Sequence, residues 1–317
     1  MMLILAWLSC SIFFSTSFIG AGYVAKYSMS LEYMMFYRLM ISSLFILMII
    51  IARKQRILIK KNEILVSVLV SASQLNVWLA TYGTKYLITG LVSCVSLLQI
   101  FVAEMLSAVV ERRKMKINII ISGLLGLVGI ACLCNQQLVG IENLDFKNTM
   151  IGIFFSFIST FAAAGGNIIY EKAGDKFREM PRTTFLLYNC FFAGIFFLIL
   201  GFFMAPVNDL LNPAIFDIKY IGVTVYLAIT ATVLALFGLY YIIEKQGAVK
   251  STYVTFIYPV LSMIISTFVE GFKWNLLAVI GMIILLYSVW IGVRPKIDYS
   301  NDENNTILKK MFHLLVK

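Results

Sequence analysis

Runs of about twenty apolar residues recur along almost the whole chain, and most of the charged residues lie in the short segments between them. A helix needs about 20 mostly apolar residues to cross a hydrocarbon core roughly 30 Å thick, so each run is long enough to span a membrane. The chain has 317 residues, of which 61% are hydrophobic, and a mean hydropathy of +0.90. A soluble domain of this composition would expose large apolar patches. The sequence therefore predicts an all-α integral membrane protein.

Charged breaks divide the chain into ten such runs. The predicted spans are 2–24, 33–52, 63–84, 87–110, 116–135, 148–170, 182–204, 219–243, 249–270 and 275–293. Only short loops and one tail remain, and none is long enough for a folded soluble domain. We therefore expect the function within the bilayer, in a multi-pass protein of the cell (inner or plasma) membrane.

Lysines and arginines are distributed unevenly over the loops. With the N-terminus placed in the cytoplasm, 20 of them fall on the inner side and 5 on the outer side. Inner loops of membrane proteins are rich in Lys and Arg, so both termini are predicted to be cytoplasmic. One missed span would reverse every later loop and remove this asymmetry. The net charge of +10 is explained by these loops beside lipid, and no nucleic-acid partner is expected.

An internal repeat accompanies this pattern. Glu111 and Glu270 are 159 residues apart, and each follows a long apolar run. The same shift superposes further residues, namely Tyr82 on Tyr241, Ser107 on Ser266 and Lys114 on Lys273. Five spans separate the copies, so the second copy must run through the membrane upside down, as in many secondary transporters.

The repeat predicts three parts of the chain. Residues 1–140 form a first five-helix repeat, and residues 148–296 form a second, inverted one. Residues 297–317 form a cytoplasmic tail in which Ile307 to Phe312 is predicted to be a short basic amphipathic helix on the inner leaflet.

Each predicted half closes with a glycine-spaced last span, and the ninth span contains Tyr258-Pro259-Val260 in its middle. The glycines are Gly123, Gly126, Gly129 and Gly281. With two five-span halves and short loops, the chain resembles the EamA-type members of the drug/metabolite transporter superfamily along nearly its whole length. The resemblance implies transport of small organic solutes such as amino acids, amines, nucleoside-like metabolites or toxic compounds, often outward.

The chain departs from the family's pattern in two places. Ile100 stands where the first half would carry the counterpart of the mid-span proline. The family's glutamate after these spans would fall near Arg113 and Phe272, whereas the acids here, Glu111 and Glu270, come two residues earlier.

Two ionisable residues lie within the predicted spans. Arg38 lies toward the outer half of the second span and Glu104 toward the inner half of the fourth. At 1.5 Å per residue each is roughly 7 to 9 Å from the middle of the membrane, on opposite sides, which argues against a direct salt bridge. A central arginine costs at least ~2.5 kcal/mol in a membrane, so both need partners or water. We expect Arg38 to anchor a substrate carboxylate and Glu104 to be a proton or cation coupling site; snorkelling or pairing with helix-end carbonyls is the alternative.

A layer of polar side chains is predicted at the middle of the membrane. It comprises Gln74, Asn76, Gln99, Thr230, Thr232 and Tyr258. Gln99 and Tyr258 are equivalent in the repeat, so a pseudo-two-fold axis would bring them to one cavity that binds a polar solute. The alternative is interhelical hydrogen bonding, worth around 0.6 kcal/mol for each bond. Pro259 removes one backbone hydrogen bond at this depth and is predicted to be a hinge.

The sequence contains no nucleophile–base pair, metal-ligand cluster, phosphate loop or ATP-binding module. It therefore predicts no enzyme, no cofactor, no metal site and no primary pump. The predicted function is a secondary transporter that moves small organic metabolites by alternating access, with the solute, membrane lipids and protons or another coupling ion as partners. Small-residue faces leave a homodimer open. The alternatives are a non-transporting scaffold or channel-like protein, and an intramembrane enzyme acting on lipid, which would need paired acids or a histidine at one depth.

Overall fold

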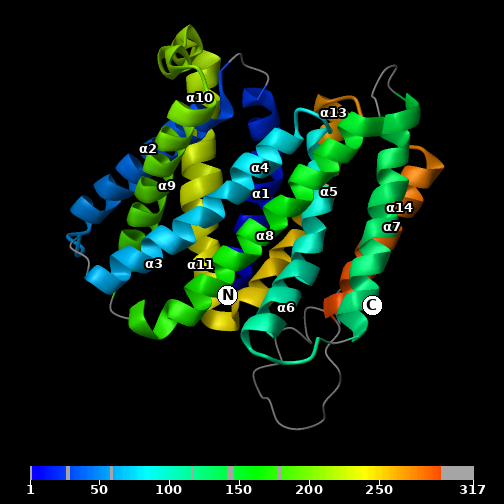
Figure 1. Cartoon of the computed structure of the whole chain (residues 1–317), viewed down its shortest axis with the longest axis horizontal. Coiled ribbons are helices and arrows are strands. Elements are labelled where there is room, and N and C mark those ends of the chain that lie inside the picture. Colours follow the sequence, from blue (N-terminus) through cyan, green and yellow to red (C-terminus); the bar gives the residue numbers. More distant parts are fainter. Residues whose placement is uncertain are drawn as a thin grey trace.

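The computed structural model describes residues 2–25, 29–57, 60–115, 117–140, 146–177 and 180–293. All regular structure within these ranges is helical (Figure 1). Nine helical stretches of the described residues are long and apolar enough to cross a membrane, and Leu276–Gly292 is a shorter apolar helix. The chain is therefore an all-helical, multi-pass membrane protein. The predicted helix of the tail lies outside the described residues.

Five of these stretches and the shorter helix α14 are single continuous helices, and their bounds agree with the predicted spans to within a few residues, except that α8 runs on to residue 177. They are α1 (Met2–Val24), α2 (Leu31–Ala52), α7 (Ile117–Gly140), α8 (Phe146–Phe177), α9 (Arg182–Met204) and α14 (Leu276–Val293). Large apolar side chains such as Leu44, Leu124 and Phe203 remain exposed on these helices. Exposure of this kind suits a surface that faces lipid instead of water.

Four further stretches are interrupted near their middle. Two contain a 3₁₀ turn each in the first half of the chain: α3 (Lys61–Ser71), η1 (Ala72–Gln74) and α4 (Leu75–Gly83), then α5 (Thr89–Val95), η2 (Ser96–Leu98) and α6 (Gln99–Val110). The third contains a π-helix, in the order α10 (Ile218–Tyr226), η5 (Leu227–Leu234) and α11 (Ala235–Gln246). The fourth consists of α12 (Ala248–Ser251), a 3₁₀ helix η6 (Thr252–Phe256) and α13 (Tyr258–Val269).

These interruptions matter because irregular backbone at membrane depth is tolerated only when it is buried in protein or lines a polar cavity. Pro259 accounts for the break before α13, since proline removes a helical hydrogen bond. The break between η2 and α6 occurs without a proline, at Gln99 and Ile100. The sequence therefore indicated one of the four breaks directly.

Helices that are far apart in the sequence pack in pairs. The pairs with the most extensive contact are α7 with α14 and α2 with α9, and α5 packs on α13 between them. Figure 1 shows α7 and α14 side by side at one edge of the bundle. A Cβ atom on Gly129 would lie 2.9 Å from the carbonyl oxygen of Gly281, and a Cβ on Gly281 would lie 2.8 Å from that of Gly129. Only glycine permits so close a backbone approach at this crossing.

The two ends of the bundle differ in their polar contacts. At one end α2, α6, α8 and α11 finish among arginines and lysines, and we call it the basic end. At the opposite end the Glu270 carboxylate accepts hydrogen bonds from the Thr89 backbone N–H at 3.0 Å and from the Thr89 hydroxyl at 2.8 Å. The Ser266 hydroxyl donates a short hydrogen bond to the same carboxylate. These bonds join the end of α13 to the start of α5.

Candidate solute-binding site

An internal cavity of about 100 Å³ lies where the four helix breaks meet. Gln74 is the last residue of η1, Gln99 is the first residue of α6, and Tyr258 is the first residue of α13. Thr232 belongs to the π-helix. The cavity is therefore lined by the positions at which the regular helical backbone is interrupted, and those positions carry polar side chains.

The structure brings together five of the residues that the sequence singled out for this site. Arg38, Gln74, Asn76, Gln99 and Tyr258 all line the cavity. Other polar residues in its wall include Ser73, Ser96, Asn167, Thr232, Thr252 and Thr255. Hydroxyl and amide groups therefore make up most of its polar lining, and Arg38 is the charged residue in this wall.

Arg38 is buried, with 6% of its surface exposed. Its Nε donates a hydrogen bond to the Thr232 hydroxyl at 3.0 Å. Among the described residues, no carboxylate lies within ion-pair distance of the guanidinium, and no hydrogen bond involves its terminal nitrogens. A buried cation without an anionic partner is energetically costly, so the arrangement suits a negatively charged guest.

Gln74 is held from the other half of the chain. Its Nε2 donates to the Oδ1 of Asn189 at 3.2 Å, and both side chains are buried. The Nδ2 of Asn189 has no hydrogen-bond partner within the described structure. The sequence interpretation did not include Asn189. It could have been found by counting, because Arg38 and Asn189 are each the eighth residue of their helices, α2 and α9.

Aromatic side chains form another part of the wall. The Tyr258 ring stacks on Phe18 with centroids 5.4 Å apart, and Phe14 meets its edge at 6.0 Å. Both phenylalanines line the cavity together with Tyr258. The site therefore offers an apolar surface as well as hydrogen-bonding groups, as small-molecule sites usually do.

Thr230, which we expected in the same layer, lies outside this lining. Its hydroxyl donates to the backbone carbonyl of Tyr226 at 2.6 Å, while Thr232 lines the cavity and contacts Arg38. The reason is the π-helix over Leu227–Leu234, which has more residues per turn than an α-helix and rotates the side chains that follow. Pro259 lies at the start of α13 beside Tyr258, where the break makes a hinge geometrically feasible.

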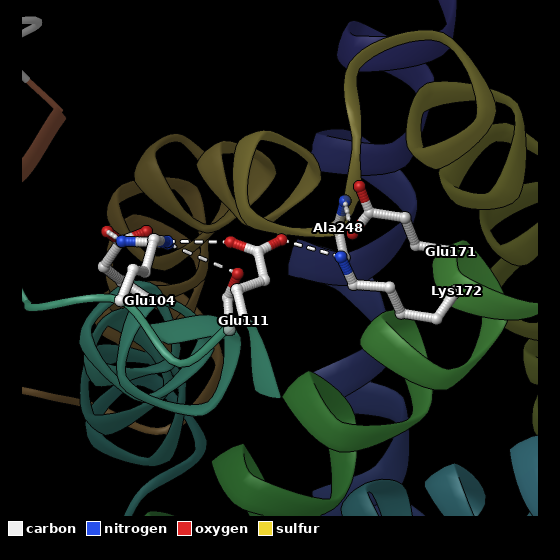
Figure 2. Close-up of polar contacts among 7 residues, drawn as sticks. Glu104, Glu111, Glu171, Lys172 and Ala248 are labelled. Atoms are coloured by element: carbon white, nitrogen blue, oxygen red, sulfur yellow. Dashed lines mark hydrogen bonds and ion pairs between the residues drawn. The ribbon is translucent and has the colours of Figure 1, made fainter. Parts of the chain in front are cut away.

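Glu104 lies in a charged network at the basic end and does not line the cavity (Figure 2). Arg113 donates to Glu104 at 2.6 Å and to Glu111 at 2.7 Å, and Lys172 donates to Glu111 at 2.7 Å. Hydrogen bonds from Lys172 and Arg113 lower the pKa of Glu111 from 4.5 to about 2. Arg38 and Glu104 thus have separate partners, and the coupling role of Glu104 stays a prediction.

The arrangement can bind and orient a small polar solute. Within the described residues no group of three or more His, Cys, Asp or Glu side chains could hold a metal ion. Pockets for drug-sized ligands measure roughly 300 to 1,000 Å³, so a cavity of about 100 Å³ must widen before an organic solute fits. Helix breaks around the cavity provide places at which such widening can occur.

Residues 150–294 match the sequence profile described as the EamA-like transporter family. This part of the chain is an EamA-like unit. The match agrees with the resemblance to the drug/metabolite transporter superfamily, and over this part of the chain it indicates a membrane transporter of that type. The prediction that it is not an enzyme agrees with this family of transporters and otherwise stays a prediction.

A solved structure shares the fold of this chain. Titled only as the crystal structure of a protein, it superposes with a TM-score of 0.63 and 13% sequence identity, over 92% of this chain and 96% of the other. At that identity the likeness concerns the fold alone. No curated protein gives a significant match.

Proposed function

We propose that this EamA-like chain is a secondary transporter that moves small organic metabolites, such as amino acids or amines, by alternating access around the cavity at the helix breaks. The observation that carries the proposal is that interrupted helices converge on one buried cavity containing Arg38, whose terminal nitrogens have no protein partner among the described residues. Secondary transporters commonly bind their solutes between discontinuous helices near the middle of the membrane.

The proposal includes ten spans in two inverted halves, residues 1–140 and 148–296, with both termini in the cytoplasm. Its support is the reciprocal pattern of contacts. The α7–α14, α2–α9 and α5–α13 pairs each join a predicted span to its own equivalent. The remaining contacts also occur in matching couples, because α4 packs on α8 while α11 packs on α1. A pseudo-two-fold arrangement produces such couples.

Within this function we assign Arg38 the role of anchoring a carboxylate. Arginine presents several N–H donors in a fixed plane and binds carboxylates through two parallel hydrogen bonds. Nε donates its hydrogen bond to Thr232, which leaves Nη1 and Nη2 to bind the carboxylate. Gln74, Asn76, Gln99 and Tyr258 would bind the rest of a polar solute.

Glu104 retains its proposed coupling role through Arg113. A proton or cation that bound Glu104 would weaken its 2.6 Å ion pair with Arg113. Arg113 also contacts Glu111 at the basic end of the bundle. Glu104→Gln in proteoliposomes tests this role. Unchanged pH dependence of flux in that variant would remove it.

Counterflow of solute into proteoliposomes is the decisive experiment for transport itself. Solutes are first screened by thermal stabilisation of the purified protein, and the hits are then tested for saturable counterflow. A scaffold or channel-like protein, which is the rival function, would show no saturable counterflow for any metabolite class. Saturable exchange that is lost in Arg38→Gln would support the proposed site.

A further inference from the structure

A second and larger pocket opens at the basic end of the bundle. Its volume is about 690 Å³, and it lies among the ends of α2, α8 and α11 and the start of α9. Its charged lining residues are Arg53, Glu171, Arg182, Glu244 and Lys245. None of the residues assigned to the solute site contributes to it.

A wall of three aromatic rings separates this pocket from the central cavity. Tyr240 lines the cavity, whereas Tyr170 and Phe185 line the pocket. The ring centroids are 4.4 Å apart for Tyr170 and Tyr240, 5.2 Å for Phe185 and Tyr240, and 4.8 Å for Tyr170 and Phe185. All three side chains are buried. The two spaces are therefore divided by these packed rings, with Tyr240 on the side of the cavity and Tyr170 and Phe185 on the side of the pocket.

The Glu244 carboxylate holds this wall from the side of the pocket through two hydrogen bonds. The Tyr170 hydroxyl donates to Oε1 of Glu244 at 2.7 Å. Arg182 Nε donates to Oε2 of the same carboxylate at 2.8 Å, and its guanidinium lies over the Tyr241 ring at 4.8 Å from the centroid. Tyr170 is on α8, Arg182 on α9 and Glu244 on α11, so the contact joins the three helices that carry the rings.

The charged side chains of the pocket differ in the hydrogen-bond and ion-pair partners that they have. Both oxygens of Glu244 accept hydrogen bonds, and Glu171 accepts one from the backbone N–H of Ala248 at 3.1 Å (Figure 2). The side chains of Arg53 and Lys245 have no hydrogen-bond or ion-pair partner within the described part of the chain. Three cations and two carboxylates line the pocket, so its lining carries one net positive charge, and Arg38 is cationic beyond the wall.

We propose that this pocket is the mouth of the solute route on the predicted cytoplasmic side, that it receives solutes bearing a carboxylate, and that Tyr170, Phe185 and Tyr240 form the gate between it and the central cavity. The proposal rests on the transport function proposed above and adds the path by which a solute reaches the site. Breaking the hydrogen bond of Tyr170 to Glu244 removes one tie between α8 and α11 and makes it easier for the rings to separate.

Access of a thiol reagent to the cavity tests the gate without any transported solute. Ala163 lines the cavity, and Ala163→Cys is a small change there. Charged methanethiosulfonate reagents are applied to either membrane face, and modification is measured above that of the parent chain with its native cysteines. Phe185→Ala should raise the modification rate about tenfold from the basic end and leave it unchanged from the opposite face. Tyr170→Phe, which keeps the ring and removes only the contact with Glu244, should give a smaller increase of the same sign.

A matched control removes a ring elsewhere. Phe161 packs edge-on to Phe157 at 5.3 Å and lines neither space, so Phe161→Ala should leave the rate unchanged. Both gate variants must remain folded, as judged by monodisperse elution. Folded Phe185→Ala and Tyr170→Phe proteins with the parent's modification rate from the basic end would overturn the gate.

The charge of the reagent tests the class of solute. A sulfonate-bearing reagent should modify Ala163→Cys in the Phe185→Ala background faster than a trimethylammonium reagent of similar size. Arg53→Gln and Lys245→Gln should each reduce that ratio severalfold, because each removes an unpaired cation from the mouth. An unchanged ratio in both would overturn the preference for anions. Transport with unchanged access would refute the gate alone, and altered access without any counterflow would refute the transport function alone.

Discussion

Arg38 and Asn189 hold the same position in their helices, and each forms a hydrogen bond to the interrupted segment of a span in the other half of the chain. Both are the eighth residue, of α2 and α9 respectively. Arg38 donates to Thr232 in the π-helix, and Asn189 accepts from Gln74 at the end of η1. The two contacts are made from equivalent helix positions but differ in charge, because Arg38 is a cation and Asn189 is a neutral amide. The two sides of the cavity therefore differ in charge.

Replacing Arg38 tests the anchoring role directly. Arg38→Gln should raise the KM of a carboxylate solute about 10-fold to 100-fold, because hydrogen bonds to charged groups are worth about 1.5–3 kcal/mol. Initial rates of counterflow over a range of solute concentrations measure it. Thr232→Val is the companion variant, since it removes the acceptor that orients Arg38 and keeps the charge; a smaller, severalfold rise is expected. An unchanged KM in Arg38→Gln would contradict the role.

The bond between Gln74 and Asn189 should stabilise the fold modestly. Asn189→Leu should lower the free energy of unfolding by about 0.6–2 kcal/mol, the range for interhelical hydrogen bonds in membranes and for buried polar groups that lose a partner. Unfolding in mixed micelles measures the change. A double-mutant cycle with Gln74→Leu supplies the control, and strictly additive effects would show that the two side chains do not interact.

The crossing of α7 and α14 depends on the absence of side chains. Gly281→Ala should destabilise the protein by about 1–3 kcal/mol, because the new Cβ would lie 2.8 Å from the Gly129 carbonyl oxygen and the helices would have to move apart. Gly165→Ala is a matched control on α8, where nothing lies within 4 Å of the added atom. It should be neutral or slightly stabilising. Equal thermal midpoints for the two variants would be inconsistent with this account.

Glu270 should matter more to stability than Glu111, although the two are related by the 159-residue shift. Glu270→Gln weakens bonds from the Thr89 backbone, the Thr89 hydroxyl and the Ser266 hydroxyl, and should cost about 1–2 kcal/mol. The Glu111 side chain is 36% exposed, so Glu111→Gln should cost less than about 1 kcal/mol. Thermal unfolding at neutral pH compares them, and the reverse order would count against the structural assignment.

The charged network gives a pH signature with a defined sign. The pKa of Glu111 is lowered from 4.5 to about 2 by Lys172 and Arg113, so its contribution to stability is present above about pH 4.5 and declines as the pH falls toward 2. The difference in thermal midpoint between the parent and Glu111→Gln should be constant from neutral pH down to about 4.5 and shrink below it. A difference that grows on acidification would contradict the lowered pKa.

The spans were predictable because the charged breaks interrupt apolar runs, and the helix bounds follow them closely. The four helix breaks were largely hidden, since three of them contain no proline and their 3₁₀ or π geometry depends on packing against other spans. Thr230 illustrates the consequence, because a π-helix changes which threonine reaches the cavity.

Glu104 illustrates a second limit of the sequence. Its partner, Arg113, lies beyond the end of α6 and returns to it only because Arg112 adopts a positive φ of 51°. That turn could not be inferred from hydropathy. Gln74 and Tyr258 were singled out because depth in a span follows simply from counting residues, and their depth matched. Arg38 was expected nearer the outer face, yet it lines the same cavity.

At Gly129 and Gly281 the backbones of α7 and α14 meet with no side chain between them. This backbone contact limits how closely the two helices can approach, so a relative tilt of α7 and α14 would take place about it. The crossing is then a fulcrum. When α7 and α14 tilt about this crossing, helix ends that approach each other at one face of the membrane move apart at the other. The geometry of the crossing thereby links the two faces.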